Sequence, residues 1–210
     1  MEGIYLAVDR PDKAIKEANT ENKMKDIILL GPVAVGKTTT ARLISKKINK
    51  PVISLDELRL GYYKEIGYDH HHMKELYEKA GIMAIFQYGK IFDAYSIERI
   101  LKDHQNCIFD FGGGNIVSGY NFDLNRIKKA LEPYENVVFL VPSKDNDETL
   151  KFIYKRRDIK LSDRELIEYL VYNHSNYEVA KHTVFVKDKT PEEVCDEIVS
   201  ICNLDEKKLN

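Results

Sequence analysis

Short, continuous apolar segments alternate along the chain with longer segments in which apolar residues recur at helical spacing. Strands are expected at residues 26–30, 51–55, 106–111, 136–142 and 183–186. Helices are expected at residues 36–49, 121–134, 147–157, 162–180 and 190–203. Residues 56–105 are expected to be mainly helical, with a break near Gly67 and another near Gly81 or Gly89.

Capping residues support the last two of these helices. Ser162, followed by Glu165 three residues later, has the form of a capping box. Thr190 is an expected N-cap, with Pro191 at the first helical position. Apolar strands that alternate with helices indicate an α/β fold, here a five-stranded parallel sheet with helices on both faces.

The expected strand at 106–111 contains Asp110 and leads directly into three glycines, Gly112, Gly113 and Gly114. Consecutive glycines lose the most backbone freedom on folding, but they let another group approach the backbone closely. In doubly wound parallel sheets, ligands bind beyond the carboxyl ends of the strands. The triple glycine is therefore expected at the functional edge of the sheet.

Composition and charge narrow the class of protein. The 210 residues suffice for one buried core, and 43% hydrophobic with 31% charged residues is typical of a globular chain. A net charge of −2 argues against a nucleic-acid partner, which would require a basic face. The first residues include early acids and no long apolar run, so they are not expected to form a secretion signal or a membrane span. Three widely spaced cysteines are expected to be free buried thiols in a cytoplasmic protein.

The most specific motif is GPVAVGKTT at residues 31–39, which has the form G-x-x-x-x-G-K-[ST] between an expected strand and an expected helix. Backbone N–H groups of such a loop bind phosphate at the positive end of the helix. Lys37 is expected to contact the β- and γ-phosphates, and the Thr38 hydroxyl to bind Mg²⁺. The residues expected to bind ATP are Gly31, Val33, Ala34, Val35, Gly36, Lys37, Thr38 and Thr39.

GTPase switches, oligomeric ATPase motors and kinases all use this loop. SKDN at residues 143–146 does not fit the N-K-x-D motif that reads guanine, although Asp110 and Gly113 match the short D-x-x-G pattern of switches. A motor would carry an acidic pair where this chain has Asp110 alone. A small-molecule kinase that uses ATP and Mg²⁺ fits the length best, and a nucleotide-binding switch remains an alternative.

A cluster of cations follows the expected strand at 136–142. Its members are Lys155, Arg156, Arg157, Lys160 and Arg164. In a kinase, residues 150–165 would form a lid that closes over ATP and excludes water. Arg156 and Arg157 are expected to contact the phosphoryl group in the transition state, while most of the other cations are expected to be solvated.

These features occur in an order that resembles shikimate kinase and its relatives among the nucleoside monophosphate kinase-like P-loop kinases. The order is a P-loop, a short strand ending in ISLDE, a helical segment, a strand leading into GGG and an arginine-bearing segment. The resemblance implies a P-loop kinase domain at 26–205, preceded by a lead-in at 1–25, with residues 56–105 as an acceptor-binding insertion.

The resemblance also implies roles for individual residues. Asp56 corresponds to an aspartate that holds the acceptor hydroxyl and could take its proton, or it could be a helix N-cap. Gly112, Gly113 and Gly114 would line the acceptor pocket with backbone, and Arg59 lies in the acceptor-binding insertion. Asp110 is not part of the usual shikimate kinase pattern; it resembles a Walker B acid that could hold Mg²⁺ through water, beside Thr38.

Ser54 stands where the family commonly has the first aspartate of a D-x-D motif, and two further departures concern the acceptor carboxylate. The family holds the acceptor carboxylate with an F-R pair on the insertion and with an arginine four residues before a late tyrosine. Here Phe92 is followed by Asp93, and Asn173 stands four residues before Tyr177. Neither residue replaces a bidentate arginine, so an acceptor that is neutral, polyhydroxylated or cationic fits better than shikimate.

Two further interpretations concern the insertion and its partners. The adjacent His70, His71 and His72 point in different directions on a helix, which favours a solvated helix start over a metal site. A nucleotide kinase would need arginines that face its phosphate-bearing acceptor, and the insertion offers only Arg59 and Arg99, which disfavours a nucleotide kinase without excluding it.

The expected partner is a small-molecule substrate, and the oligomeric state stays open.

Overall fold

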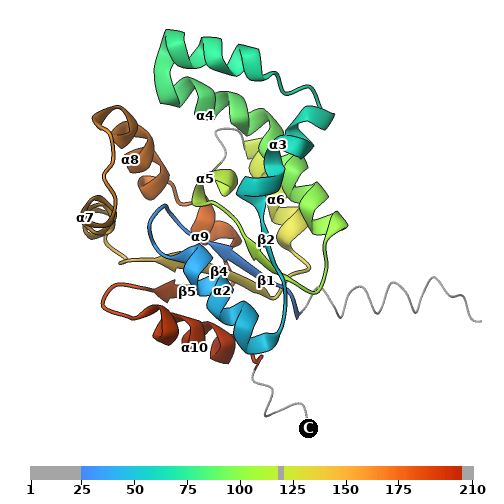
Figure 1. Cartoon of the computed structure of the whole chain (residues 1–210), viewed down its shortest axis with the longest axis vertical. Helices are drawn as coiled ribbons and strands as arrows, with labels where there is room; N and C mark the ends of the chain where they lie inside the picture. The colour runs from blue at the N-terminus through green and yellow to red at the C-terminus, as the bar shows by residue number, and fades with distance from the viewer. Residues whose placement is uncertain (1–24, 118–120, 205–210) are drawn as a thin grey trace, which may run out of the picture.

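Five parallel strands form one sheet in the order β2-β3-β1-β4-β5, as seen in a computed structural model that describes residues 25–117 and 121–204 (Figure 1). The strands are β1 (Ile27–Leu30), β2 (Val52–Ser54), β3 (Ile108–Asp110), β4 (Asn136–Val141) and β5 (His182–Phe185). Each hydrogen-bonded pair of neighbours is parallel. The expected α/β architecture with a five-stranded parallel sheet is therefore confirmed.

Helices connect these strands and pack on the two faces of the sheet. They are α2 (Lys37–Ile48), α3 (Leu55–Glu65), α4 (His70–Asp103), α5 (Gly113–Ile116), α6 (Asn121–Leu131), α7 (Asn146–Arg156), α8 (Arg164–Tyr172), α9 (Ser175–Val179) and α10 (Pro191–Ile201), with a short 3₁₀ turn η1 (Leu161–Asp163). Within the described residues, no helix is long and apolar enough to cross a membrane.

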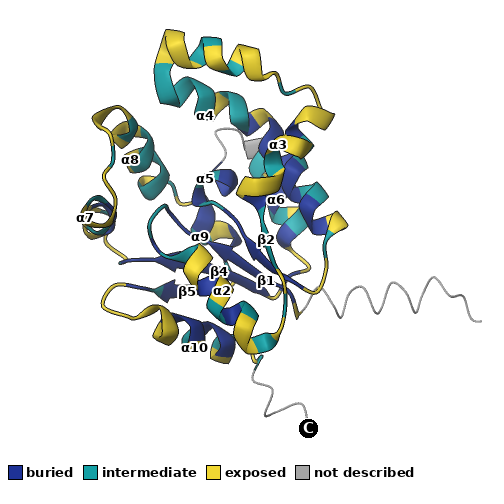
Figure 2. Cartoon of the chain, in the orientation of Figure 1, coloured by how far each residue is buried: buried dark blue, intermediate teal, exposed yellow. Residues whose placement is uncertain are grey.

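Alternate residues of each central strand enter two separate hydrophobic cores. On one face, Ile28 and Leu30 of β1 pack in a cluster with residues from α4, α6 and α9. On the other face, Ile27 and Leu29 pack with residues from α2 and α10. Figure 2 shows β1, β3 and β4 as buried strands, flanked by helices that are exposed on their outer sides. Because β1 is buried on both faces, its sequence is a continuous apolar run and does not alternate with polar residues.

The breaks in the helical segments follow local backbone geometry. Gly67, at φ +95°, lies between α3 and α4, and Gly81, at φ +73°, kinks α4, whereas Gly89 stays inside the helix. The single helix expected at 162–180 is wrong, because α8 ends at Tyr172 and α9 starts at Ser175. Ser162 lies inside η1, and α8 starts without a side-chain cap, so the capping box expected at that residue is also wrong.

The expected cap of the last helix is confirmed. The Thr190 side chain accepts the Glu193 N–H group, the Glu193 carboxylate accepts the Thr190 N–H group, and Pro191 begins α10. The lead-in expected at 1–25 lies outside the described residues except for Lys25. The division into a kinase domain, an insertion and a lid stays a prediction.

Strand register brings the expected site residues to one edge of the sheet. Asp110, the last residue of β3, pairs with Leu29 of β1 and with Ser54 of β2. The P-loop follows β1, and Asp56 lies two residues beyond β2. Because the carboxyl ends of parallel strands meet at the same edge, the P-loop, Asp110 and Asp56 converge there.

The triple glycine also lies at this edge, and its middle residue contacts the P-loop. The Gly113 N–H group donates to the Gly31 carbonyl oxygen at 2.9 Å. A Cβ atom at Gly113 would lie 2.6 Å from that oxygen, which is closer than side chains tolerate. The absence of a side chain at Gly113 therefore lets the backbone of the phosphate loop approach.

This contact predicts a large difference in stability between two neighbouring substitutions. Gly113→Ala forces the two loops apart, and we expect it to destabilise the fold by about 1–3 kcal/mol. For a chain of this length the melting temperature falls by about 2–4 °C per kcal/mol. At Gly114 an added Cβ would lie 3.6 Å from Leu170, an ordinary contact, so Gly114→Ala is the matched control. Thermal unfolding of both variants measures the difference, and equal melting temperatures would contradict it.

Candidate functional site

The loop between β1 and α2 has the geometry of an anion-binding turn. Gly36 precedes α2 at φ +95°, and no side chain caps the helix at this position. The first N–H groups of α2 therefore have no intrahelical acceptor and lie at the positive end of the helix dipole. This arrangement is suited to a phosphate group.

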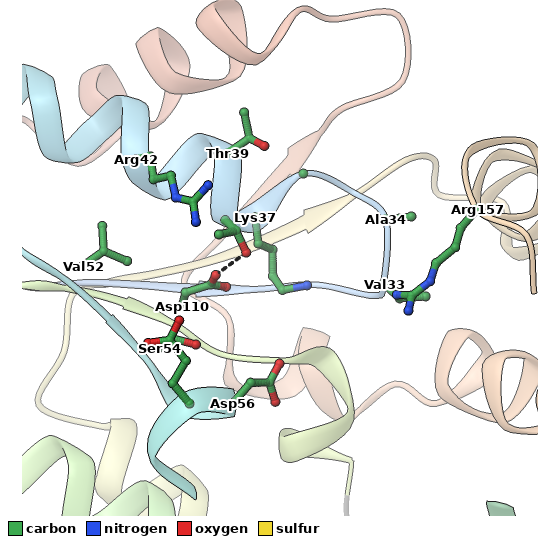
Figure 3. A pocket seen from close by; sticks show the side chains of 13 residues that line it. Val33, Ala34, Lys37, Thr39, Arg42, Val52, Ser54, Asp56, Asp110 and Arg157 are labelled. Atoms are coloured by element: carbon green, nitrogen blue, oxygen red, sulfur yellow. Dashed lines mark hydrogen bonds between the residues drawn. The ribbon is translucent and has the colours of Figure 1, made fainter.

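A cavity of about 630 Å³ opens in front of this loop (Figure 3). It is lined by Val33, Ala34, Gly36, Lys37, Thr38, Thr39, Arg42, Val52, Ser54, Asp56, Glu57, Asp110 and Arg157. The lining combines three carboxylates with a lysine and two arginines, so both signs of charge face one space. Predicted site residues from the P-loop, β3, α3 and the end of α7 meet here.

Thr38 and Asp110 form the tightest polar contact in the cavity. The Thr38 hydroxyl donates to Asp110 Oδ2 at 2.6 Å, and the Asp110 side chain is buried. These oxygen atoms are hard ligands of the kind that Mg²⁺ prefers. Because the hydroxyl donates its proton to Asp110, its oxygen lone pairs stay available to a cation. The pair expected to hold a metal thus fits Mg²⁺ by its chemistry.

Lys37 extends along the inside of the loop toward the same space (Figure 3). Its ammonium group donates to the Pro32 carbonyl oxygen at 3.0 Å. Burial lowers the pKa of Lys37, and the carboxylates of Asp110 and Asp56 oppose this shift. A phosphate bound in the loop would add negative charge beside the ammonium group and stabilise its charged form.

Asp56 faces the cavity from the first turn of α3. Ser54 occupies the N-cap position of this helix, so Asp56 is not its N-cap, which was the alternative role expected for it. Arg59 Nε lies 3.6 Å from Asp56 Oδ1, and both side chains are largely exposed. The Asp56 carboxylate is therefore accessible to a small molecule.

The two candidate arginines lie on different sides of the P-loop. Arg157, just beyond α7, lines the main cavity. Arg156 instead lies over the Phe152 ring, 4.7 Å from its centre, with a long contact of 3.5 Å to the Ala34 carbonyl oxygen. It lines a second cavity of about 290 Å³, together with Val186, Lys189, Pro191, Val194 and P-loop residues. Of these two arginines, Arg157 is the one that shares a cavity with Lys37 and Asp110.

The three glycines differ in their surroundings. A Cβ atom at Gly112 would lie 3.5 Å from both carboxylate oxygens of Asp56, so Gly112 borders the site. Gly113 is buried against Gly31, and Gly114 faces Leu170 and Phe86. Of the three, Gly112 is the one beside a residue that lines the main cavity.

The residues at the two departures that concern the acceptor carboxylate do not line this cavity. Asp93 is buried, where its carboxylate accepts hydrogen bonds from Tyr63 and Lys90. Asn173 Oδ1 accepts the Ser175 N–H group at 2.9 Å. Neither supplies a cation. The Asp93 carboxylate thus lies inside the protein, with partners from α3, α4 and α5.

The histidines at 70–72 are exposed at the start of α4, as expected, and Asp69 accepts the His71 and His72 N–H groups there. In the described part of the chain, no group of three His, Cys, Asp or Glu side chains is arranged to hold a metal ion. The first turn of α4 is therefore a capped helix start.

Sequence reasoning missed three polar residues of the cavity, Arg42, Ser54 and Glu57. Arg42 is four residues after Thr38 on α2, and residues at this spacing share one helix face. That spacing could have placed Arg42 in the site. Glu57 directly follows Asp56, and no spacing distinguishes it from an ordinary acid in the first turn of a helix.

Comparisons with known proteins agree with this geometry. The family model for shikimate kinase matches residues 33–203. A shikimate kinase of Flavobacterium psychrophilum is 26% identical over 193 residues, which cover 85% of this chain and 99% of that protein. A tRNA dimethylallyltransferase of Alkaliphilus oremlandii is also 26% identical, but over 113 residues, so the match spans 49% of this chain and about a third (36%) of that relative.

The fold has solved counterparts as well. The structure of shikimate kinase from Acinetobacter baumannii in complex with shikimate superposes with a TM-score of 0.57 at 16% identity, covering 93% of this chain and 99% of that chain. At 16% identity this superposition establishes a shared fold. The family assignment depends instead on the family model, which covers most of the sequence. The chain belongs to the shikimate kinase family of P-loop kinases.

Proposed function

We propose that this protein transfers a phosphoryl group from ATP to a hydroxyl group of a small metabolite, in a reaction that depends on Mg²⁺. One observation carries the proposal: Lys37, the Thr38–Asp110 pair and Asp56 all line one cavity. Phosphoryl transfer depends on positioning and on charge stabilisation. These residues supply a phosphate loop, a cation, a candidate metal site and a carboxylate beside them.

Each residue has a role in this proposal. The P-loop N–H groups and Lys37 bind the phosphates, and Thr38 with Asp110 would hold Mg²⁺, which neutralises charge on the β- and γ-phosphates when bound. Asp56 orients the acceptor hydroxyl and takes its proton. Arg157 approaches the transferring group from the end of α7, in the segment that we propose acts as a lid.

The second cavity is suited to the base of the nucleotide. Val186, Pro191 and Val194 supply apolar surface beside Gly36 and Thr39, and Arg156 supplies a flat cation. A planar base can stack on such surfaces. We therefore assign Arg156 to the nucleotide and Arg157 to the phosphoryl group, where the sequence left the choice open.

The acceptor we propose is neutral, polyhydroxylated or cationic. Positions 93 and 173 provide no arginine for a carboxylate, and Asp93 is buried. Arg59 lies close to the proposed acceptor site, but it already pairs with the Asp56 carboxylate. This part of the proposal concerns the substrate alone, and it can fail while the kinase activity stands.

A panel of acceptors tests both parts. Release of ADP from MgATP is measured with shikimate, neutral sugars and polyols, amino alcohols, nucleosides and nucleoside monophosphates. We expect a neutral or cationic alcohol to exceed shikimate in kcat/KM by at least about tenfold, because a site without a bidentate partner leaves a carboxylate unpaired. Shikimate as the best acceptor would contradict the substrate class, and a nucleoside monophosphate would indicate a nucleotide kinase. GTP hydrolysis that no acceptor stimulates would contradict the kinase itself.

A further inference from the structure

Lys90 and Asp93 of α4 form an ion pair that is almost completely removed from water. Each residue is 4% exposed, and the ammonium group donates directly to Asp93 Oδ2. Burying two charges costs several kcal/mol per ion unless hydrogen bonds satisfy the remaining atoms. α5, which contains the end of the triple glycine, packs against α4 (Figure 1). The partners of the pair therefore indicate what it holds in place.

The carboxylate of Asp93 joins three segments of the chain. Besides Lys90, it accepts the Tyr63 hydroxyl from α3 and, at 3.4 Å, the Asn115 side-chain amide from α5. Burial and the neighbouring Asp93 raise the pKa of Tyr63, so its hydroxyl keeps the proton that it donates. Asp93 is thus a common acceptor for α3, α4 and α5.

The ammonium group of Lys90 makes its contacts inside the protein. Its ammonium group donates to the Gly114 carbonyl oxygen as well as to Asp93, and it lies 4.5 Å from the centre of the Phe86 ring. A lysine ammonium has three N–H groups. The Asp93 carboxylate and the Gly114 carbonyl accept two of them, and the face of the Phe86 ring lies beside the ammonium group, so its contacts within the protein hold it in place.

The same loop is held from its other side. The Asn176 side-chain amide donates to the Gly113 carbonyl oxygen at 3.2 Å, and the Gly113 N–H group donates to Gly31 in the P-loop. Lys90 then fixes the next carbonyl, that of Gly114. The loop is therefore tied to α4, to α9 and to the phosphate loop through consecutive peptide groups.

We propose that Lys90 and Asp93 are positioning residues that hold the triple-glycine loop, and with it Gly112 beside Asp56, in the geometry of the acceptor site. Asp93 is an internal carboxylate already paired with Lys90, at a position where the family pattern has an arginine for the acceptor carboxylate. The consequence for acceptor binding rests on the proposed function. The positioning of the loop does not.

Asp93→Ala removes the carboxylate and leaves three donors, on Lys90, Tyr63 and Asn115, around an empty space. We expect amide hydrogen exchange in peptides covering residues 108–117 to become about tenfold faster, the equivalent of losing about 1.4 kcal/mol of local protection. Formate at about 100 mM is expected to refill the site and restore most of the protection, because its carboxylate can accept the donors that Asp93→Ala leaves without an acceptor. Sodium chloride at the same ionic strength does not.

Two further variants keep this test specific. Tyr63→Phe removes one donor to Asp93 and is mild enough to fold, and we expect exchange at 108–117 to rise about threefold. Glu98→Gln is the matched control, because Glu98 lies on the same helix and pairs with Arg126 of α6 instead. We expect it to leave residues 108–117 unchanged.

A kinetic readout separates positioning from general destabilisation. With the acceptor that the panel identifies, Tyr63→Phe raises the acceptor KM by about threefold to tenfold and leaves the ATP KM within about twofold. Unchanged exchange at 108–117 in Asp93→Ala and Tyr63→Phe, or equal acceleration in Glu98→Gln, would overturn the proposal. So would a lack of rescue by formate. The exchange measurements need no acceptor and no turnover, so they test the positioning of the loop even where the panel identifies no acceptor.

Discussion

Lys37→Met is expected to lower kcat by at least about 10²–10³-fold, the loss that follows removal of one preorganised group that stabilises transition-state charge. Methionine keeps the length of the side chain and removes its charge. The effect is expected to be large because Lys37 lies inside the phosphate loop, with its ammonium group held by the Pro32 carbonyl oxygen in a partly buried place. Electrostatic interactions are stronger in such places than in water. Steady-state kinetics with MgATP and the identified acceptor measure the loss.

Lys47→Met is the matched control for this substitution. Lys47 lies in the last turn of the same helix α2 and pairs with Asp196 on the protein surface at 2.9 Å. Exposed ion pairs contribute about 0–1 kcal/mol, so we expect nearly unchanged kinetics. A Lys37→Met protein that melts like the parent and keeps more than about a tenth of its kcat would contradict the assigned role.

The strand–loop–helix unit at the centre of the fold was predictable from the sequence, because two local patterns determine it. A continuous apolar run such as residues 27–30 is compatible only with burial on both faces, and the glycine–lysine motif after it fixes a strand, a turn and a helix. The helix ends were less predictable. The extended backbone at Asn173 separates α8 from α9, and periodicity alone does not contain that information.

The candidate site separates into a part that was predictable and a part that was not. Lys37, Thr38, Asp56 and Asp110 follow directly from strand ends and a local motif, and the structure brings them to one cavity. The burial of Asp93 was not predictable, because it depends on its partners, which are Lys90 and Tyr63, thirty positions earlier. The separation of Arg156 from Arg157 also depends on packing, since adjacent residues at the end of a helix diverge.

Asp56→Asn is the second substitution from which we expect a large effect, a fall in kcat of about 10²–10⁴-fold, the range of a general base. Asparagine keeps the size and most hydrogen bonds of aspartate, but it cannot accept a proton. Asp56 is exposed to the cavity, and its carboxylate is close to Gly112 and to Arg59. The nucleotide is bound by a different element, so the Kd of MgADP, measured by calorimetry, is expected to stay within about twofold.

Asp196→Asn removes an equivalent carboxylate from the surface pair with Lys47 and controls for charge alone. The division between kcat and KM then identifies what Asp56 does. A fall in kcat with little change in acceptor KM indicates proton transfer, because that interaction forms only in the transition state. A rise in acceptor KM with unchanged kcat would instead reduce Asp56 to a binding residue, and the attacking hydroxyl would then lose its proton without a base from α3. Such a result is compatible with a loose phosphoryl-transfer transition state, in which the acceptor gains little positive charge before the bond to the leaving group breaks.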